Sequence, residues 1–226
     1  MSLILQIETA TTSCSVALAK DGQVLAFQEI DQRNIHAEVI TLFIDQLLKQ
    51  TNTAYTDIDA VAVSCGPGSY TGLRIGVSTA KGLCFALDKP LIAVNTLAAM
   101  AKGITNDLMD ADMLLCPMID ARRMEVFTAI YSITGAVIKP TAAEIIDENS
   151  FADILATNSV MFFGDGAEKC GDYLGRNPNA IIKPGFINSA VHLSEIAAAK
   201  FEKAEFEDVA YFEPYYLKDF IAGKKA

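Results

Sequence analysis

The chain has 226 residues, of which 51% are hydrophobic, so it is long enough to bury a sizeable core in two lobes. Its formal net charge of −10 argues against independent binding to a phosphate backbone, which needs clustered lysine and arginine. The five cysteines are odd in number and widely spaced, as expected for reduced thiols in a cytoplasmic protein. We expect no signal peptide and no membrane span, because no uncharged apolar run is long enough.

The first half of the chain is predicted to form a mixed sheet with helices. Apolar runs predict three strands, at residues 3–7, 15–19 and 24–30. The Asp21-Gly22 pair is typical of a type I′ hairpin turn. Asn34 can cap a helix over residues 35–50, whose apolar set is wider than one buried face requires. The next elements are expected as strand 58–64, a helix ending at residue 87, strand 90–94 and helix 96–102.

The second half repeats this order of elements without a residue-level repeat. The expected strands are 114–120, 124–131, 136–138, 160–163 and 181–183, and the expected helices are 149–156, 167–174 and 189–206. The duplication predicts a two-lobed α/β fold, with a mixed sheet and helices on both faces in each lobe. We expect the lobes to be residues 1–106 plus 207–226 and residues 107–206, joined near Asp107–Asp112. The aromatic tail at residues 213–218 is expected to pack back onto the first lobe.

A glycine-rich loop, Gly66-Pro67-Gly68, leads into the helix that ends at residue 87. Ser69 and Thr71 are candidate N-caps, and Gly72, Gly76 and Ala80 recur every fourth residue, which places a stripe of small residues on one face. Such a loop at a helix N-terminus can bind an anion, or it can simply allow a tight connection and a close helix contact. The spacing matches neither a Walker loop nor a dinucleotide fingerprint, so both interpretations stay open.

A second possible nucleotide site lies between the first two strands. Glu8, Thr9 and Thr12 stand in a turn where actin-like kinases hold ATP phosphates, but Ala10 replaces the glycine that lets backbone approach phosphate. A weakened nucleotide site at this turn is about as plausible as a simple hairpin with satisfied hydroxyls, and Gly66 and Gly68 would belong to the same site. The equivalent turn in the second lobe, at Asp120, also lacks the glycine.

Other chemistry-bearing residues give weaker signals. His36 and His192 have no second ligand type at metal spacing, so we predict no metal site. Asp120, Arg122, Arg123 and Glu125 form the densest charged cluster. This cluster either lines a cleft between the lobes or forms a solvated hairpin tip, and the second interpretation is slightly favoured.

Several motifs together carry a family resemblance over most of the chain. The long and specific motif is Ser64-x-Gly66-Pro67-Gly68-Ser69-x-Thr71-Gly72-Leu73-Arg74-x-Gly76, followed by Ala80-Lys81-Gly82-Leu83. The supporting motifs are Asp120-Ala121-Arg122, Glu125-Val126-Phe127 and Pro214-x-Tyr216-Leu217. With these residues the chain resembles the TsaB (YeaZ) family, bacterial proteins needed to make threonylcarbamoyladenosine in tRNA.

The resemblance implies an actin-like (ASKHA, ribonuclease-H-like) fold and a subunit that is not itself an enzyme. The catalytic TsaD family shares the glycine loop but has two metal-binding histidines just downstream. Thr96 and Met100 stand at those positions here, and neither can hold such a metal. The resemblance therefore implies neither a metal nor another cofactor.

The resemblance also implies partners. The family pairs with the TsaD-type catalytic subunit through helices of the first lobe, works with a TsaE-type ATPase, and meets tRNA only through that complex. In isolation a homodimer through the same helices is expected. The residues expected at the partner surface are Val39, Ile40, Phe43, Leu47, Gly72, Leu73, Gly76 and Ala80.

Two other functions compete with this one. An ATP-dependent small-molecule kinase of the same superfamily would need a working phosphate site. A metalloprotease is disfavoured because the sequence has no two-histidine site.

Overall fold

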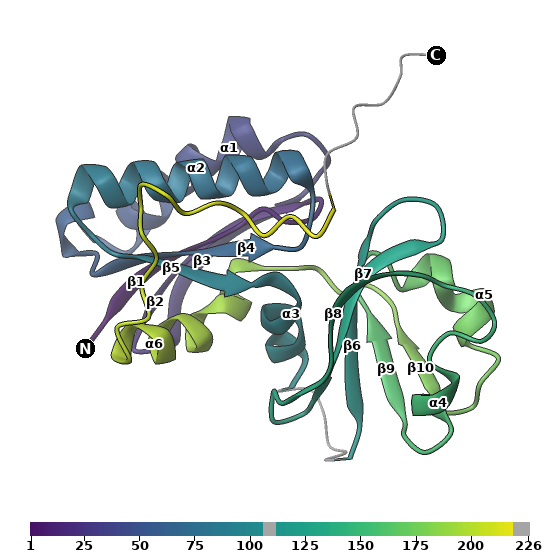
Figure 1. The fold of residues 1–226 in the computed structure, drawn as a ribbon. Coiled ribbons are helices and arrows are strands. Elements are labelled where there is room, and N and C mark those ends of the chain that lie inside the picture. Colours follow the sequence, from purple (N-terminus) through teal and green to yellow (C-terminus); the bar gives the residue numbers. More distant parts are fainter. Residues whose placement is uncertain (106–111, 219–226) are drawn as a thin grey trace, which may run out of the picture.

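The computed structural model describes residues 1–105 and 112–218, which form two five-stranded sheets (Figure 1). The strand order is β3-β2-β1-β4-β5 in the first sheet and β10-β9-β6-β7-β8 in the second. In each sheet three sequential strands pair antiparallel, and the two later strands pair parallel on the other side of the first one. The predicted duplication and two-lobed α/β class are confirmed.

The first sheet is built close to the predicted positions. Its strands are β1 (Leu3–Glu8), β2 (Ser13–Lys20), β3 (Gln23–Asp31), β4 (Ala60–Gly66) and β5 (Leu91–Asn95). Asp21 and Gly22 both have positive φ, 50° and 80°, and Lys20 pairs with Gln23, which confirms the two-residue hairpin.

Helices cover both faces of the first sheet (Figure 1). Leu5 of β1 points into a core shared with α1 (His36–Gln50) and α2 (Tyr70–Leu87). Its neighbour Ile4 points to the other face, against the short η3 turn (Ala190–Leu193) and α6 (Ser194–Glu202). Because successive side chains of β1 point to opposite faces of the sheet, this one strand contributes to two separate cores.

The second sheet has β6 (Leu114–Asp120), β7 (Glu125–Ser132), β8 (Val137–Ile145), β9 (Val160–Phe163) and β10 (Ala180–Lys183). One face packs on the short helices α4 (Ala152–Leu155) and α5 (Gly171–Leu174). The other face packs on α3 (Thr96–Thr105), which lies between the two sheets (Figure 1).

Three helix boundaries differ from the prediction for identifiable backbone reasons. Asn34 has a φ of 62° and does not cap α1, whose N-cap is Ile35 without a side-chain bond. Phe151 has a φ of 61°, so the helix expected from residue 149 cannot begin before Ala152. Ala204 has a φ of 52°, and α6 ends just before it. By contrast, Ser69 is confirmed as the N-cap of α2, since its hydroxyl accepts from the Gly72 amide.

The lobe division also differs from the predicted one. Leu193 and Ala197 pack with Ile4 and Ile92, so residues 190–202 belong with the first sheet although they were assigned to the second lobe. Of the expected junction Asp107–Asp112, only its last residue lies within the described part of the chain. We propose lobes divided near residue 189 instead of residue 206.

The aromatic tail packs on the first lobe, as predicted. The Tyr215 amide donates to the Cys65 carbonyl at 2.7 Å, and the Tyr216 ring lies 4.8 Å from that of Tyr70. Within residues 1–105 and 112–218, no helix is both long and apolar enough to cross a membrane.

Candidate functional site

The glycine-rich loop before α2 is closed by the turn between β1 and β2 of the same chain. The Ser69 amide donates to the Ala10 carbonyl at 2.7 Å, and a Cβ on Gly68 would lie 2.5 Å from that same oxygen. A Cβ on Gly72 would overlap the Thr9 carbonyl oxygen. The turn therefore occupies the space in which a phosphate would have to sit, and this geometry opposes a nucleotide site at Gly66 and Gly68.

The stripe of small residues on α2 faces the same turn and not a partner. A Cβ on Gly76 would overlap the Thr9 hydroxyl, and Leu73 and Ala80 are buried in the chain itself. The prediction that Gly72, Leu73, Gly76 and Ala80 contact a partner is therefore corrected. The close surface that the glycines accommodate is an intramolecular one.

Glu8 at the end of β1 is fully buried, and no cation of the described residues lies beside it. Burial raises the pKa of its carboxyl from 4.5 to about 7, although the Ala10 amide and the side chains of Ser64 and Asn188 act to lower it. The Ala10 amide donates to the carboxyl at 2.6 Å. One carboxyl oxygen is thus tied into its own turn, whereas Oε2 is buried without a hydrogen-bond partner among the described residues.

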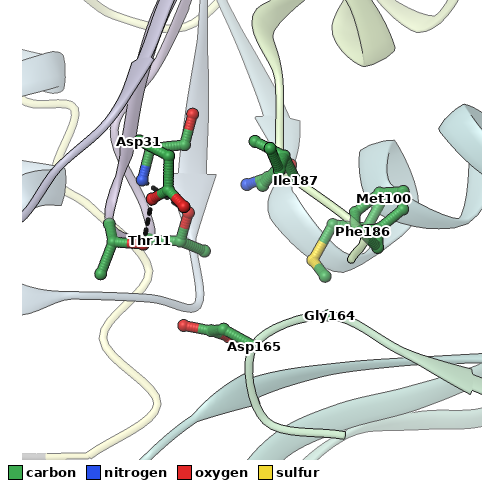
Figure 2. Close-up of a pocket in the computed structure, with 10 residues that line it drawn as sticks. Thr11, Asp31, Met100, Gly164, Asp165, Phe186 and Ile187 are labelled. Atoms are coloured by element: carbon green, nitrogen blue, oxygen red, sulfur yellow. Dashed lines mark hydrogen bonds between the residues drawn. The ribbon is translucent and has the colours of Figure 1, made fainter. Parts of the chain in front are cut away.

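Thr12 and Thr9, the other two residues predicted at this turn, are engaged or enclosed as well. The Thr12 hydroxyl donates to Asp31 at the end of β3, at 2.5 Å (Figure 2). Thr9 is fully buried under α2. Neither side chain is directed at a space large enough for a nucleotide.

A small pocket lies where the β1–β2 turn meets the loop after β9 (Figure 2). Its volume is about 50 Å³, and its lining residues are Thr11, Thr12, Ser13, Asp31, Met100, Gly164, Asp165, Phe186, Ile187 and Asn188. Nucleotide-sized ligands need pockets of roughly 300 Å³ or more. No lysine or arginine lines it to neutralise phosphate, so the pocket suits ordered water.

Thr96 and Met100, at the positions where the resemblance places metal-binding histidines in the catalytic family, have structural roles. The Thr96 hydroxyl accepts from the Gly66 amide at 3.1 Å and thereby fixes the glycine loop. The Met100 methyl packs under Gly164, which links α3 to the second lobe. Within the part of the chain that the structure describes, no three metal-ligating side chains come together.

The two histidines are both enclosed by the protein. His36 shares its Nε2 between the carbonyl oxygens of Thr11 and Ser13. His192 stacks on Phe186, and burial lowers the pKa of its imidazole to about 4. Both therefore serve the packing around the β1–β2 turn and α3.

The outward faces of α1 and α2 each expose one large apolar side chain, and the sequence located these positions only in part. Ile40 and Leu47 are buried in the core, so their predicted contact with a partner is corrected, whereas Val39 and Phe43 are half-buried at its edge. The exposed apolar residues are instead Leu42 on α1 and Phe85 on α2, at 58% and 86% exposure, with the small residues Ser78, Gly82 and Ala86 on the same α2 face. Phe85 does not lie on the helix face of the buried stripe Gly72, Gly76 and Ala80. This difference in helical position is the sequence signal that could have identified it as exposed.

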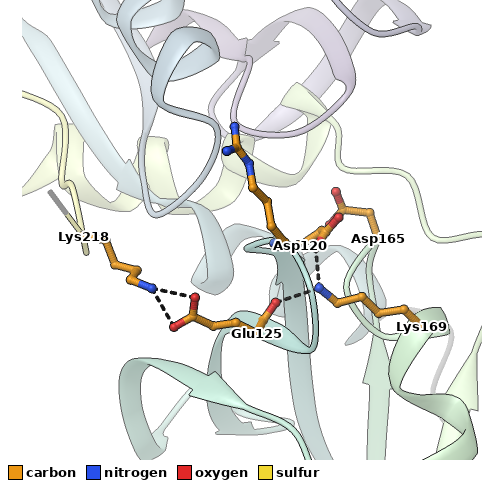
Figure 3. A network of polar contacts seen from close by, with 6 residues as sticks. Asp120, Glu125, Asp165, Lys169 and Lys218 are labelled. Atoms are coloured by element: carbon orange, nitrogen blue, oxygen red, sulfur yellow. Dashed lines mark hydrogen bonds and ion pairs between the residues drawn. The ribbon is translucent and has the colours of Figure 1, made fainter. Parts of the chain in front are cut away.

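The charged cluster at the β6–β7 hairpin is an ordered network (Figure 3). Lys169 bonds to the Asp120 carboxylate and to the Glu125 carbonyl. Lys218 of the tail contacts both Glu125 carboxylate oxygens, at 2.6 and 2.7 Å. The cluster is therefore not simply a solvated hairpin tip, because it joins the tail to the second lobe.

Comparison with known proteins gives the family of this chain. The family model described as TsaD, tRNA N6-adenosine threonylcarbamoyltransferase, matches residues 28–224. The tRNA threonylcarbamoyladenosine biosynthesis protein TsaB of Escherichia coli is 35% identical over 98% of this chain and 97% of its own length. The chain belongs to the TsaB (YeaZ) family.

Solved structures give the same family and the wider fold. YeaZ from Pseudomonas aeruginosa superposes with a TM-score of 0.80 at 28% identity, covering 96% of this chain and all of that one. The activator of 2-hydroxyisocaproyl-CoA dehydratase from Clostridium difficile, solved with bound ADPNP, covers 90% of this chain and 97% of its own, with a TM-score of 0.53 at 11% identity. That second likeness concerns the actin-like fold alone.

Proposed function

We propose that this chain serves the biosynthesis of threonylcarbamoyladenosine in tRNA as a supporting subunit that does not carry out the transfer. The observation that carries this proposal is the closed glycine loop, in which Ala10 and Thr9 take the place of a phosphate. A buried Glu8 without a neighbouring cation and a pocket of about 50 Å³ support it, because neither suits Mg-ATP. The same geometry opposes the alternative of a small-molecule kinase.

Reconstitution tests this role. Unmodified tRNA, threonine, bicarbonate and ATP are supplied with the enzyme that makes threonylcarbamoyl-adenylate, a TsaD-type subunit and a TsaE-type ATPase. We expect modified adenosine to accumulate when this chain is added and to stay at background without it. Mass spectrometry of the digested tRNA measures the product. Modification at equal rates with and without the chain would contradict the proposal, and so would transfer by the chain in the absence of the TsaD-type subunit.

We propose that the pairing with the TsaD-type subunit uses the outward faces of α1 and α2. Leu42 on α1 and Phe85 on α2 are exposed apolar side chains, and Phe85 shares its helix face with the small residues Ser78, Gly82 and Ala86, which let a second helix approach closely. In isolation the same faces would pair two copies of the chain about a two-fold axis. Val39 and Phe43 lie at the edge of this surface.

Replacing Phe85 by arginine is expected to weaken that pairing by about 30-fold, the effect of losing a 2 kcal/mol aromatic hot spot. Analytical ultracentrifugation and interferometry with the TsaD-type subunit measure it. Ile145→Arg is the matched control, because Ile145 is 73% exposed on β8, far along the chain from both helices. Unchanged affinity in the Phe85 variant, or equal losses in both variants, would overturn the proposed surface.

A further inference from the structure

Three of the five arginines in this acidic chain lie on one connected path across both lobes: Arg74, Arg122 and Arg123. Arg74 stands on the second turn of α2, with its guanidinium carbon 4.7 Å from the centre of the Tyr70 ring. Tyr70 in turn lies against Tyr216 of the tail, with ring centres 4.8 Å apart at 35°. A cation and two aromatic rings are therefore held together where the tail crosses the start of α2.

The tail carries this path to the second lobe. Two residues beyond Tyr216, Lys218 reaches Glu125, which immediately follows the β6–β7 turn that contains Arg122 and Arg123 (Figure 3). We call the set Arg74, Tyr70, Tyr216, Arg122 and Arg123 the arginine–tyrosine surface.

Two of the acidic groups beside this surface are already paired with lysines. Asp120 pairs with Lys169, and Glu125 pairs with Lys218. Among the described residues, no carboxylate forms an ion pair with the exposed side chains of Arg122 or Arg123. Their guanidinium groups stay available to an external anion although the whole chain carries a net charge of −10.

The backbone holds the two arginines at the tip of a tight turn. Arg122 and Arg123 have φ values of 74° and 51°, a region that side-chain-bearing residues rarely occupy. The turn is fixed because the Arg122 amide donates to Asp120 at 2.8 Å and the Ala121 amide donates to the Glu125 carbonyl at 3.1 Å. Strained turns of this kind persist where the surrounding structure over-determines them, often at binding sites.

We propose that the arginine–tyrosine surface binds the phosphodiester backbone of RNA, with the tyrosines offering a face to an unstacked base. Guanidinium groups form bidentate hydrogen bonds with phosphate oxygens, and aromatic rings stack on the bases of single-stranded loops. This inference rests on the proposed function, which makes the RNA the substrate tRNA. Three arginines on an acidic chain bind RNA weakly alone, so the contact acts within the assembled complex.

The test measures binding of fluorescein-labelled unmodified tRNA to the complex of this chain with the TsaD-type and TsaE-type subunits. Fluorescence anisotropy over a range of KCl concentrations is compared for the wild type, the double variant Arg122→Gln/Arg123→Gln and Arg74→Gln. The control is Arg176→Gln, since Arg176 is an exposed arginine that pairs with Glu148 and stacks on Tyr173, both of which lie outside the arginine–tyrosine surface. Glutamine removes the positive charge but keeps a polar side chain with a non-branched stem, and at Arg122 and Arg123 it leaves the same backbone strain.

We expect the slope of log affinity against log salt to become less steep by about 1 for each phosphate contact removed, with no change in the control. The KM for tRNA should rise while kcat stays constant. Unchanged affinity and slope in the double variant, with the complex intact by size-exclusion chromatography, would refute the inference. Loss of complex assembly instead would show that the surface docks an acidic protein and would refute it too. Failure of the wild-type complex to modify tRNA would count against the proposed function, whereas the binding curves still decide the RNA contact.

Discussion

Replacing Gly72 by alanine is expected to lower the free energy of unfolding by about 3 kcal/mol, the upper end of the usual cost of overpacking. The added methyl would overlap the Thr9 carbonyl oxygen, which is backbone and cannot move without displacing the end of β1. Ser69 and Ala10 would be forced apart at the same time, since their hydrogen bond lies beside the contact. Urea unfolding followed by circular dichroism measures the change.

Gly82→Ala in the same helix is the matched control. A Cβ at Gly82 meets nothing within 4 Å, and the residue is exposed. Alanine there should raise the stability by about 1 kcal/mol, because glycine in a helix costs that much. If the two substitutions changed the free energy of unfolding by similar amounts, the β1–β2 turn would not be in close contact with α2 at Gly72. The same contact at Gly76 means that a Gly76→Arg variant would disturb folding and cannot report on partner binding.

Replacing Glu8 by glutamine is expected to stabilise the protein at pH 8 by about 3 kcal/mol and to have little effect at pH 4.5. Burial raises the pKa of this carboxyl to about 7 in the folded state, from 4.5 when it is exposed. Between those values the folded state binds more protons than the unfolded state, so stability falls as the pH rises and levels off above about 7. A shift of roughly 2.5 pH units at 1.36 kcal/mol each gives the size of the effect.

Unfolding by urea at intervals from pH 4.5 to 9 checks this prediction. The difference between wild type and Glu8→Gln isolates the one carboxyl, because every other group titrates in both proteins. Glu205→Gln, at an exposed position after α6, should run parallel to the wild type. If the free energy of unfolding of the wild type and of the Glu8 variant changed in parallel over the whole pH range, burial would not raise the pKa of Glu8, and the prediction would be wrong.

Much of the fold could be predicted from local pattern. Asp21-Gly22 specified its hairpin, and the apolar runs placed β6 and β9 at their observed bounds. The repeated order of elements was enough to predict two equivalent sheets. Helix starts were harder to predict. Asparagine favours both the N-cap and left-handed backbone, and Asn34 adopts the second, while Phe151 adopts a left-handed backbone that is rare for its residue type.

The candidate site was predicted less well, because residue spacing does not say which surface a helix face meets. The recurrence of a small residue at every fourth position, Gly72, Gly76 and Ala80, indicated that another group approaches closely. The approaching residue, Thr9, is more than 60 residues earlier in the chain. Likewise the width of the apolar set on α1 was visible, while its division into buried Ile40 and exposed Leu42 depends on how α2 packs beside it.

The sequence by itself determined the family, the duplicated order of strands and the absence of metal-binding histidines after β5, since each of these depends on residue identity and local order. Only the tertiary structure decided what fills the glycine-rich loop and what the charged hairpin does. The Ala10 carbonyl reaches Ser69, and Lys218 reaches Glu125, through contacts between segments distant along the chain. Such contacts are set by the packing of the two lobes and the tail, which no local pattern encodes.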